Sequence, residues 1–388
     1  MKLPHDFAFG TATSATQIEG GCSTIDWWDF TGGAIGAACD HWNRWREDVA
    51  LQTRLGVGAH RMSIEWGRVE PVEGRFDDAA LDRYREEIAL LRASGIEPMV
   101  TLHHFSFPTW LARRGGATAP DFPARFAHYA ERVGRALADR VGLWSTVNEP
   151  NVLVAQGYLL GVWPPGKREP REVLRAVRQL RRAHVAAYRV LHRVAPGASV
   201  GLAHHVRLAE PASTRVADRL AAGALDLAFN RAFLDLPQDF VGLNYYTRDV
   251  VRFDRRNRGE LFAVRTVPEG APISDLGWEI HPRGLGVVLR ELARKRKPIW
   301  ITENGIADAA DTRRERFIVD HLREIALAID DGVLVRGYLH WSLLDNFEWA
   351  EGYAPRFGLY AVDYATQERA LRPSGEAYAA IAKSREFR

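Results

Sequence analysis

The chain has 388 residues, a length that one α/β barrel reaches as a single domain. Its residues are 46% hydrophobic and 26% charged, which is typical of a globular enzyme and excludes a disordered or membrane-embedded chain. The formal net charge is +3, and the basic residues are scattered along helical stretches between acidic ones, so we expect no nucleic-acid partner.

The N-terminal segment MKLPHDFAFG contains no apolar run long enough for a signal peptide, and about 18 consecutive apolar residues occur nowhere in the chain. These observations predict a cytoplasmic protein without a membrane partner. Cys22 and Cys39 lie in one early connection and could pair, but two cysteines in so long a chain make no disulfide framework, so we expect free thiols. The sequence carries no indication of an oligomeric state.

In chain order, short β-rich runs that end in polar residues alternate with longer runs of helical spacing. The stretch LDRYREEIALLRASG illustrates a helical run, because Leu81, Tyr84, Ile88 and Leu91 share one face and Gly95 provides the stop. Strands are predicted at 7–13, 59–64, 98–103, 143–148, 199–204, 240–245, 298–302 and 335–342. Helices are predicted near 44–55, 78–94, 123–140, 170–192, 213–232, 283–296, 312–330 and 374–383.

Eight strands that alternate with helices favour a closed parallel (β/α)8 TIM barrel, because parallel neighbours need helical crossovers and a closed sheet leaves no edge. A doubly wound open sheet is the alternative. No Gly- and Ser-rich linker, low-complexity tract or internal repeat divides the chain, so we expect residues 1–388 to form one domain.

If the barrel forms, the carboxyl ends of its strands face one bowl, where side chains from distant sequence positions converge. Those ends are rich in polar and aromatic residues, which a purely structural barrel does not require. In chain order they are Gln17, Arg61, His103, His104, Asn148, Glu149, His204, His205, Asn244, Tyr245, Tyr246, Glu303, Trp341, Glu348 and Trp349. We therefore expect one functional site in the bowl.

Two of these ends carry a glutamate after an apolar strand, Glu149 in LWSTVNEP and Glu303 in IWITENG. Because strands four and seven lie across the bowl, both carboxyls could face one substrate, as glycoside hydrolysis requires. Two carboxyls that close do not both ionise easily, so one is expected to stay protonated and act as the acid. Arg61 and Tyr246 are candidates to hold Glu303 ionised, and Asn148 is a candidate donor to a sugar hydroxyl.

His103 and His104 suggest a metal site as an alternative, since histidines at barrel ends bind zinc in some enzymes. Adjacent strand residues point to opposite faces, however, and no third ligand stands in a suitable position, so we expect neither a metal nor an organic cofactor. Trp341 and Trp349 bracket the carboxylate of Glu348, which suits a sugar, because aromatic faces stack on C–H surfaces while carboxylates bind hydroxyls.

These motifs resemble glycoside hydrolase family 1, the retaining β-glucosidase and β-galactosidase family, and the resemblance runs essentially from end to end. TVNEP is similar to the acid/base motif and ITENG to the nucleophile motif, which implies these roles for Glu149 and Glu303. FAFGTATSATQIEG resembles the N-terminal signature and VTLHHFSFP the strand-three segment. That resemblance implies Gln17 and His104, rather than His103, as sugar-binding residues.

Three further segments are similar to the family's substrate-binding elements. GLNYYT implies Asn244 near the site and Tyr246 hydrogen-bonded to the nucleophile, and LGWEI implies Trp278 beside the leaving group. The long segment WSLLDNFEWAEGYAPRFGLYAVDY implies a sugar platform, two residues that bind hydroxyls and a nearby aromatic, which are in order Trp341, Glu348, Trp349 and Phe357.

The position of Glu348 bears on the substrate. Family members that cleave 6-phosphorylated sugars lack a carboxylate there, because it would repel the phosphate. The resemblance therefore implies a retaining exo-β-glycosidase for unphosphorylated β-D-glycosides or oligosaccharides, with β-glucosides preferred and β-galactosides or β-fucosides as further substrates. A non-catalytic sugar-binding barrel, a metal-dependent hydrolase and a transglycosylating member are the alternatives.

Three departures from the family pattern concern the outer part of the site. Phe105 stands where the family usually has Trp, and Ala15 and Thr16 precede Gln17 where an aromatic is common. The chain is also shorter than usual members, with the shortening after Gly20 and around NRAFLDLPQDFVGLNYY. Since those connections wall the outer subsites, the departures bear on the leaving group rather than on catalysis.

Overall fold

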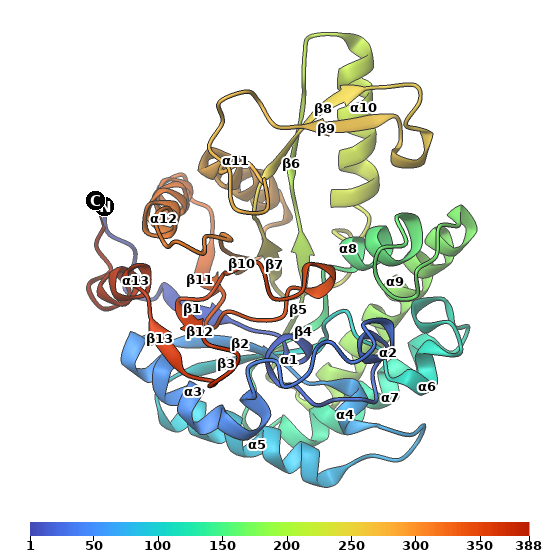
Figure 1. The fold of residues 1–388 in the computed structure, drawn as a ribbon, viewed down its shortest axis with the longest axis vertical. Helices are drawn as coiled ribbons and strands as arrows, with labels where there is room; N and C mark the ends of the chain where they lie inside the picture. Colours follow the sequence, from blue (N-terminus) through green and yellow to red (C-terminus); the bar gives the residue numbers. More distant parts are fainter. Residues whose placement is uncertain (388) are drawn as a thin grey trace.

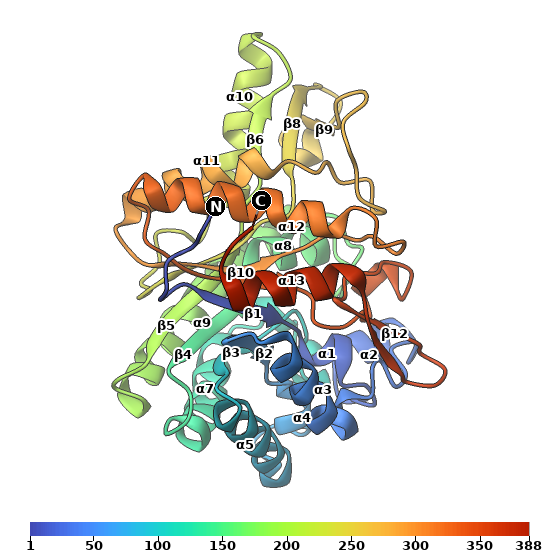
Figure 2. The same cartoon turned by 90° about the vertical axis from the view of Figure 1, so that its left-hand side faces the viewer.

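The protein, described here over residues 1–387 without the side chain of Arg258, forms a closed barrel of eight parallel strands in this computed structural model (Figures 1 and 2). The strands follow each other around the barrel in the order β1-β11-β10-β7-β5-β4-β3-β2. The predicted TIM barrel is confirmed, and the open sheet is excluded because β1 pairs with both β2 and β11. The barrel strands are β1 (Ala8–Ala12), β2 (Ala59–Ser63), β3 (Glu97–His103), β4 (Leu143–Asn148), β5 (Ser199–His205), β7 (Val241–Asn244), β10 (Ile299–Asn304) and β11 (Val335–Trp341).

Long helices surround the barrel and bury one face against it (Figure 1). In α7, for example, Phe122, Phe126, Tyr129, Val133 and Leu137 are buried along one side, as an amphipathic helix requires. The long helices are α3 (His41–Leu55), α5 (Asp78–Ala93), α7 (Phe122–Leu137), α9 (Pro170–Val194), α10 (Val216–Leu225), α11 (Pro282–Leu292), α12 (Arg314–Asp330) and α13 (Pro373–Ser384).

Each predicted strand and each predicted helix has a counterpart, with boundaries displaced by a few residues at most ends. Pro170, Pro282 and Pro373 open α9, α11 and α13, because the fixed φ of proline suits the first helical position. The predicted helix over 213–232 begins later, as α10, and continues as the π-helix η3 (Asp226–Asn230).

The connections contain elements that the sequence did not indicate. Five are short α-helices: α1 (Ala15–Ile18), α2 (Asp26–Phe30), α4 (Trp66–Val69), α6 (Thr109–Ala112) and α8 (Pro150–Val154). Others are the π-helix η2 (Ala155–Leu159) and the 3-10 helices η1 (Gly116–Thr118), η4 (Arg258–Glu260) and η6 (Trp349–Glu351). The 3-10 helix η5 (Ala293–Lys295), in contrast, lies at the end of the helix predicted over 283–296.

Two small sheets also lie outside the barrel. One has the order β6-β8-β9 and packs beside α10 at the top of Figure 1, and the other pairs β12 with β13. Their strands have three to six residues and mix apolar with charged side chains, as in RDVVRF and AVRT, which is also typical of exposed loops. They are β6 (Leu208–Pro211), β8 (Arg248–Phe253), β9 (Ala263–Thr266), β12 (Tyr360–Val362) and β13 (Arg369–Leu371).

The two ends of the described chain lie side by side (Figure 2). The amino group of Met1 donates to the carbonyl of Phe387 at 2.6 Å, and Lys2 forms an antiparallel bridge with Glu386. Both ends therefore lie near the start of β1, at the amino-terminal end of the barrel strands.

Cys22 and Cys39 are both buried and free, as predicted. Within residues 1–387, no helix is long and apolar enough to cross a membrane.

Candidate active site

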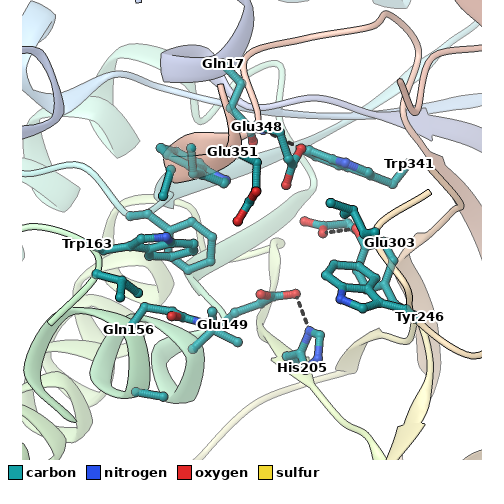
Figure 3. Close-up of a pocket in the computed structure, with 18 of the residues that line it drawn as sticks. Gln17, Glu149, Gln156, Trp163, His205, Tyr246, Glu303, Trp341, Glu348 and Glu351 are labelled. Atoms are coloured by element: carbon teal, nitrogen blue, oxygen red, sulfur yellow. Dashed lines mark hydrogen bonds and ion pairs between the residues drawn. The ribbon is translucent and has the colours of Figure 1, made fainter. Parts of the chain in front are cut away.

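A cavity of about 420 Å³ opens at the carboxyl ends of the barrel strands (Figure 3). This volume lies within the range of small-molecule sites. Its walls include both strand-end glutamates together with aromatic residues from distant segments. The residues given a catalytic or binding role from the sequence that line it are Gln17, His104, Glu149, Tyr246, Trp278, Glu303, Trp341, Glu348, Trp349 and Phe357.

Strand β4 delivers Glu149 to the cavity through an irregular end. The pairing of β4 with β5 shifts its register between Ser145 and Asn148, and Glu149 has a φ of 40°, in the left-handed region, just before α8. A non-glycine residue there is strained by about 1–2 kcal/mol, so the surroundings must hold it. Its backbone N–H donates to the Ala203 carbonyl at 2.8 Å, which ties this turn to β5.

The two carboxyl oxygens of Glu149 have different surroundings. Oε1 lies within hydrogen-bond distance of His205 Nδ1 at 3.0 Å and accepts a hydrogen bond from Asn244 Nδ2 at 2.7 Å. Oε2 accepts none from the residues that the structure describes. Glu149 is therefore oriented through one oxygen, and the other is left free to carry a proton.

Glu303 reaches the cavity from β10, again beside a register shift, which lies between Ile301 and Glu303 in the pairing with β7. Such irregularities re-aim a side chain that a regular strand would direct elsewhere. Both carboxyl oxygens accept a hydrogen bond: Oε1 from the guanidinium of Arg61 and Oε2 from the hydroxyl of Tyr246 at 2.8 Å. The predicted partners of Glu303 are thus in place around it.

Burial, together with the nearby charge of Glu149, raises the pKa of Glu303 to about 7, whereas Arg61 and the hydrogen bond from Tyr246 oppose the rise. Both oxygens of Glu303 accept from donors, whereas Oε2 of Glu149 has no donor among the described residues. These contacts favour the carboxylate form of Glu303, which is the form that a nucleophile needs.

Fully buried polar side chains connect the two glutamates beneath the cavity. Arg61 donates to Glu303 through one nitrogen and to Asn148 Oδ1 through another at 2.7 Å. Asn244 Nδ2 is shared between Asn148 Oδ1 at 3.0 Å and Glu149 Oε1 at 2.7 Å. Arg61, Asn148 and Asn244 have no exposed surface, so they support the cavity floor from below.

His104 and His103 have different surroundings, although they are adjacent. His104 lines the cavity between the planes of Trp341 and Trp349, and its Nε2 faces Asn148 Nδ2 at 3.0 Å. The amide of Asn148 is directed to His104, so a direct contact between Asn148 and a sugar hydroxyl stays a prediction.

His103 instead packs among Phe107 and Phe126, and burial lowers its pKa to about 3. The two imidazoles do not converge. Over residues 1–387, no group of three or more His, Cys, Asp or Glu side chains is arranged to hold a metal ion.

One end of the cavity, which we call the inner end, combines Gln17 and Glu348 with the indole of Trp341 (Figure 3). Gln17 Nε2 lies 2.8 Å from Asn346 Oδ1 and 3.2 Å from Glu348 Oε2, so the amide orients the carboxyl. Burial raises the pKa of Glu348 to about 8, and the charges of Glu303 and Glu149 add to the rise. The inner end thus presents carboxyl and amide groups beside an aromatic face.

The other end, which we call the outer end, is built by residues to which the sequence analysis gave no role. Trp163 and Gln156 lie across the cavity from Trp341 and Tyr246 (Figure 3). They belong to η2 and the loop after it, and these follow the short helix α8, which no sequence pattern indicated. The other lining residues without an assigned role include Val152, Ala155, Val162, Arg207, Phe229, Leu276 and Glu351.

His205 is a further lining residue that the sequence only placed at a strand end. Its contact with Glu149 depends on how β5 is aligned with β4, and a sequence pattern does not reveal that alignment. The sequence indicated only that both β4 and β5 end in polar residues, and not that these residues are in contact.

Known proteins with a similar sequence identify the family to which this site belongs. A model of glycosyl hydrolase family 1 matches residues 1–238 and residues 228–387, which together take in nearly the whole chain. The chain belongs to glycosyl hydrolase family 1. The resemblance stated from the motifs is confirmed, and the protein is a glycoside hydrolase.

Relatives of this family 1 member match along its full length. Beta-glucosidase A of Thermotoga maritima is 35% identical, and the match covers 99% of this chain and 98% of that protein. Among solved structures, a beta-glycosidase from Pyrococcus horikoshii is 41% identical with a TM-score of 0.95, covering 100% of this chain and 96% of the other. The beta-glucosidase of Thermotoga maritima in complex with glucoimidazole is 34% identical with a TM-score of 0.93, and both chains are covered completely.

The family 1 alignment also bears on the predicted shortening. It spans 441 positions against Beta-glucosidase A, whereas this chain has 388 residues, so at least 53 positions lie opposite gaps in this chain. At the outer end, Phe105 packs against Trp163 and Trp349 with ring centroids 4.9 and 5.3 Å apart. Phe105, which departs from the family pattern, therefore belongs to an aromatic cluster in the wall of the cavity.

Proposed function

We propose that this family 1 glycoside hydrolase is a retaining exo-β-glycosidase that hydrolyses unphosphorylated β-D-glycosides, with β-glucosides preferred. The observation that carries the proposal is the pair Glu149 and Glu303 in one cavity, each with its own set of donors. The β-glucosidase names of its relatives support the preferred sugar. β-Galactosides and β-fucosides are proposed as further substrates.

In the first step, a carboxylate oxygen of Glu303 attacks the anomeric carbon, and the bond from that carbon to the glycosidic oxygen breaks. Glu149 transfers the proton of its free oxygen to the departing oxygen, so the leaving group departs as a neutral alcohol. Arg61 and Tyr246 orient Glu303 for the attack, because each of its oxygens is held by one donor. Glu149 ends this step as a carboxylate.

In the second step, the ionised Glu149 removes a proton from water, and the water oxygen attacks the anomeric carbon of the glycosyl-enzyme ester. The ester bond to Glu303 breaks and Glu303 returns as a carboxylate. Two displacements at one carbon give net retention of configuration. The steps use water and the two glutamates, and no cofactor is proposed.

At the inner end, we propose that Gln17, His104, Glu348 and Trp349 bind the hydroxyls of the terminal sugar and that Trp341 forms its platform. We also propose that Trp278 and Phe357 lie beside the substrate. Arg207 is the single Lys or Arg among the described lining residues, and it is paired with Asp249 at 2.9 Å. A sugar phosphate would therefore meet the carboxylate of Glu303 without a free cation among these residues to pair with, which supports an unphosphorylated substrate.

The test is the variant Glu303→Gly, assayed with an activated aryl β-glucoside and added azide. Without its nucleophile the variant should be inactive alone, and azide should restore turnover by attacking from the vacated side, giving an α-glucosyl azide. Failure of azide to restore turnover in folded variant protein would show that Glu303 is not the nucleophile.

The matched control is Glu149→Gly with the same substrate and azide. Here the covalent intermediate still forms with a good leaving group, and azide replaces water in the second step, so the product should be a β-glucosyl azide. The opposite configurations of the two azides separate the two roles. The same configuration from both variants would contradict the double displacement.

Binding of glucose without hydrolysis of any aryl β-glycoside, by folded protein, would favour a sugar-binding barrel instead. Transglycosylation would appear as oligosaccharide products at high substrate concentration. The cytoplasmic location and the single-domain organisation of residues 1–388 stay predictions.

A further inference from the structure

We propose that His205 is a positioning residue for the acid/base glutamate, so that it directs the transferable proton to one oxygen of Glu149 and stabilises the carboxylate left after proton transfer. The inference rests on the proposed function. It starts from the 3.0 Å contact between His205 Nδ1 and Glu149 Oε1, which Figure 3 shows as a dashed line.

The contact fixes the hydrogen on the imidazole. A carboxyl oxygen without a proton is an acceptor only, so Nδ1 must carry the hydrogen of this bond. Asn244 donates to the same Oε1 at 2.7 Å. With two donors on Oε1, we assign the proton that Glu149 transfers to Oε2, and after the transfer both donors remain on Oε1 of the carboxylate.

The imidazole is held in its plane by its neighbours. It stacks on the ring of Tyr246, with centroids 5.9 Å apart and planes 17° apart, and it meets Phe229 edge-on at 5.9 Å. The backbone carbonyl of His205 accepts from Asn151 Nδ2 at 2.8 Å, which fixes the end of β5 against α8. His205 is nearly buried, so little of its ring is exposed and the neighbouring side chains restrict its orientation.

A hydrogen bond to a carboxylate is stronger than one to a neutral carboxyl. The His205 contact therefore gains strength as Glu149 gives up its proton, which is the direction of the first step. The contact should therefore accelerate the first step most for leaving groups that depart only when fully protonated. Activated aryl leaving groups need little protonation, so the contact matters less for them.

The titratable and charged groups that face His205 belong to several elements. Glu149 faces it from the end of β4, Tyr246 follows β7, Arg207 follows β5, and Glu303 faces the same cavity from β10. Arg207 is paired with Asp249 at 2.9 Å. Because these neighbours stay the same in every variant of His205, a change in the pH profile among the variants can be attributed to His205 itself.

The experiment compares wild type, His205→Phe and His205→Asn. Phe retains an aromatic ring beside Tyr246 and Phe229 but lacks the donor, whereas the Asn amide restores a donor without an imidazole. Thermal unfolding of each variant establishes that it is folded. kcat/KM is then measured from pH 4 to 10 with 2,4-dinitrophenyl β-glucoside and with an alkyl β-glucoside.

For His205→Phe we expect the basic limb of the alkyl glucoside profile to move up by about one pH unit. kcat/KM for the alkyl glucoside should fall about tenfold at its optimum, with little change for the dinitrophenyl glucoside. His205→Asn should restore most of both effects. The proposal would be overturned if kcat/KM fell equally for both substrates while the basic limb stayed in place. It would also be overturned if the Asn variant behaved like the Phe variant. Inactive wild type on both substrates would instead contradict the proposed function.

Discussion

The inner and outer ends of the cavity are built by different means. At the inner end, the floor residues Arg61, Asn148 and Asn244 are fully buried and connected by hydrogen bonds that reach both glutamates. At the outer end, the wall is formed largely by apolar and aromatic side chains such as Val162 and Trp163, carried by short helices and loops. The inner end therefore holds the two catalytic carboxyls in defined positions, whereas the apolar wall of the outer end can accept leaving groups of different shapes.

The variant Arg61→Met breaks the inner end most severely. It leaves Glu303 buried without its cation, which costs about 3–5 kcal/mol for a broken buried ion pair. We expect kcat/KM to fall about 10³-fold. The pKa of Glu303 should also rise above its present value of about 7, because the guanidinium opposes that rise. Steady-state kinetics across pH measures both effects, and a loss below tenfold would contradict this account of the floor.

Tyr246→Phe removes a single hydrogen bond from the same carboxyl. The bond at 2.8 Å favours the ionised form of Glu303, so its loss should raise the pKa of Glu303 and move the acid limb of kcat/KM upward by about one pH unit. Below pH 6 the activity should fall about tenfold, and the loss should shrink above pH 8. An acid limb at the wild-type position would show that the tyrosine does not hold the nucleophile ionised.

Glu348→Gln tests the charge at the inner end through stability. The folded-state pKa of Glu348 is about 8, above the ordinary value of 4.5, so the folded protein binds a proton that the unfolded chain releases. The contribution of this group to the free energy of unfolding therefore falls as pH rises from 4.5 through 8. Urea unfolding should find the variant more stable than wild type by about 2 kcal/mol at pH 6, and by more at pH 9. Below pH 5 the two should agree, and a difference independent of pH would exclude titration as the cause.

Trp163→Leu probes the outer end and should have the smallest effect. We expect KM for an aryl β-glucoside to rise about fivefold, which corresponds to about 1 kcal/mol, the lower end of what an apolar contact contributes. For methyl β-glucoside, whose leaving group is too small to reach the wall, KM should stay unchanged. Equal effects on the two substrates would mean that Trp163 acts on the whole cavity rather than on the leaving group.

Much of the barrel could be predicted from the sequence, and the reason is visible in β4 and β10. Each begins with large apolar residues and ends in a polar one where it reaches the bowl, because the strand is covered by helices and its end meets the cavity. The β6-β8-β9 sheet gave no such signal. Its strands are short and partly exposed, so their apolar and charged residues follow no pattern that distinguishes a strand from a loop.

The site divides in a similar way. Glu149 and Glu303 stand in motifs, and their strand positions could be read in sequence order. The contact of His205 with Glu149 could not, because it depends on the register shift between β4 and β5. Trp163 could not be placed either, since the helix α8 and the π-helix η2 that precede it have no distinct periodicity over so few residues.

The paired chain ends have a practical consequence. Met1 and Phe387 are hydrogen-bonded neighbours near the amino-terminal end of the strands, while the cavity opens at the carboxyl end. A short peptide linker could join the two ends, and new termini could then be opened in a surface connection, giving a circular permutant. Attachment to a solid support near Met1 or Phe387 would leave the substrate entrance directed away from the surface.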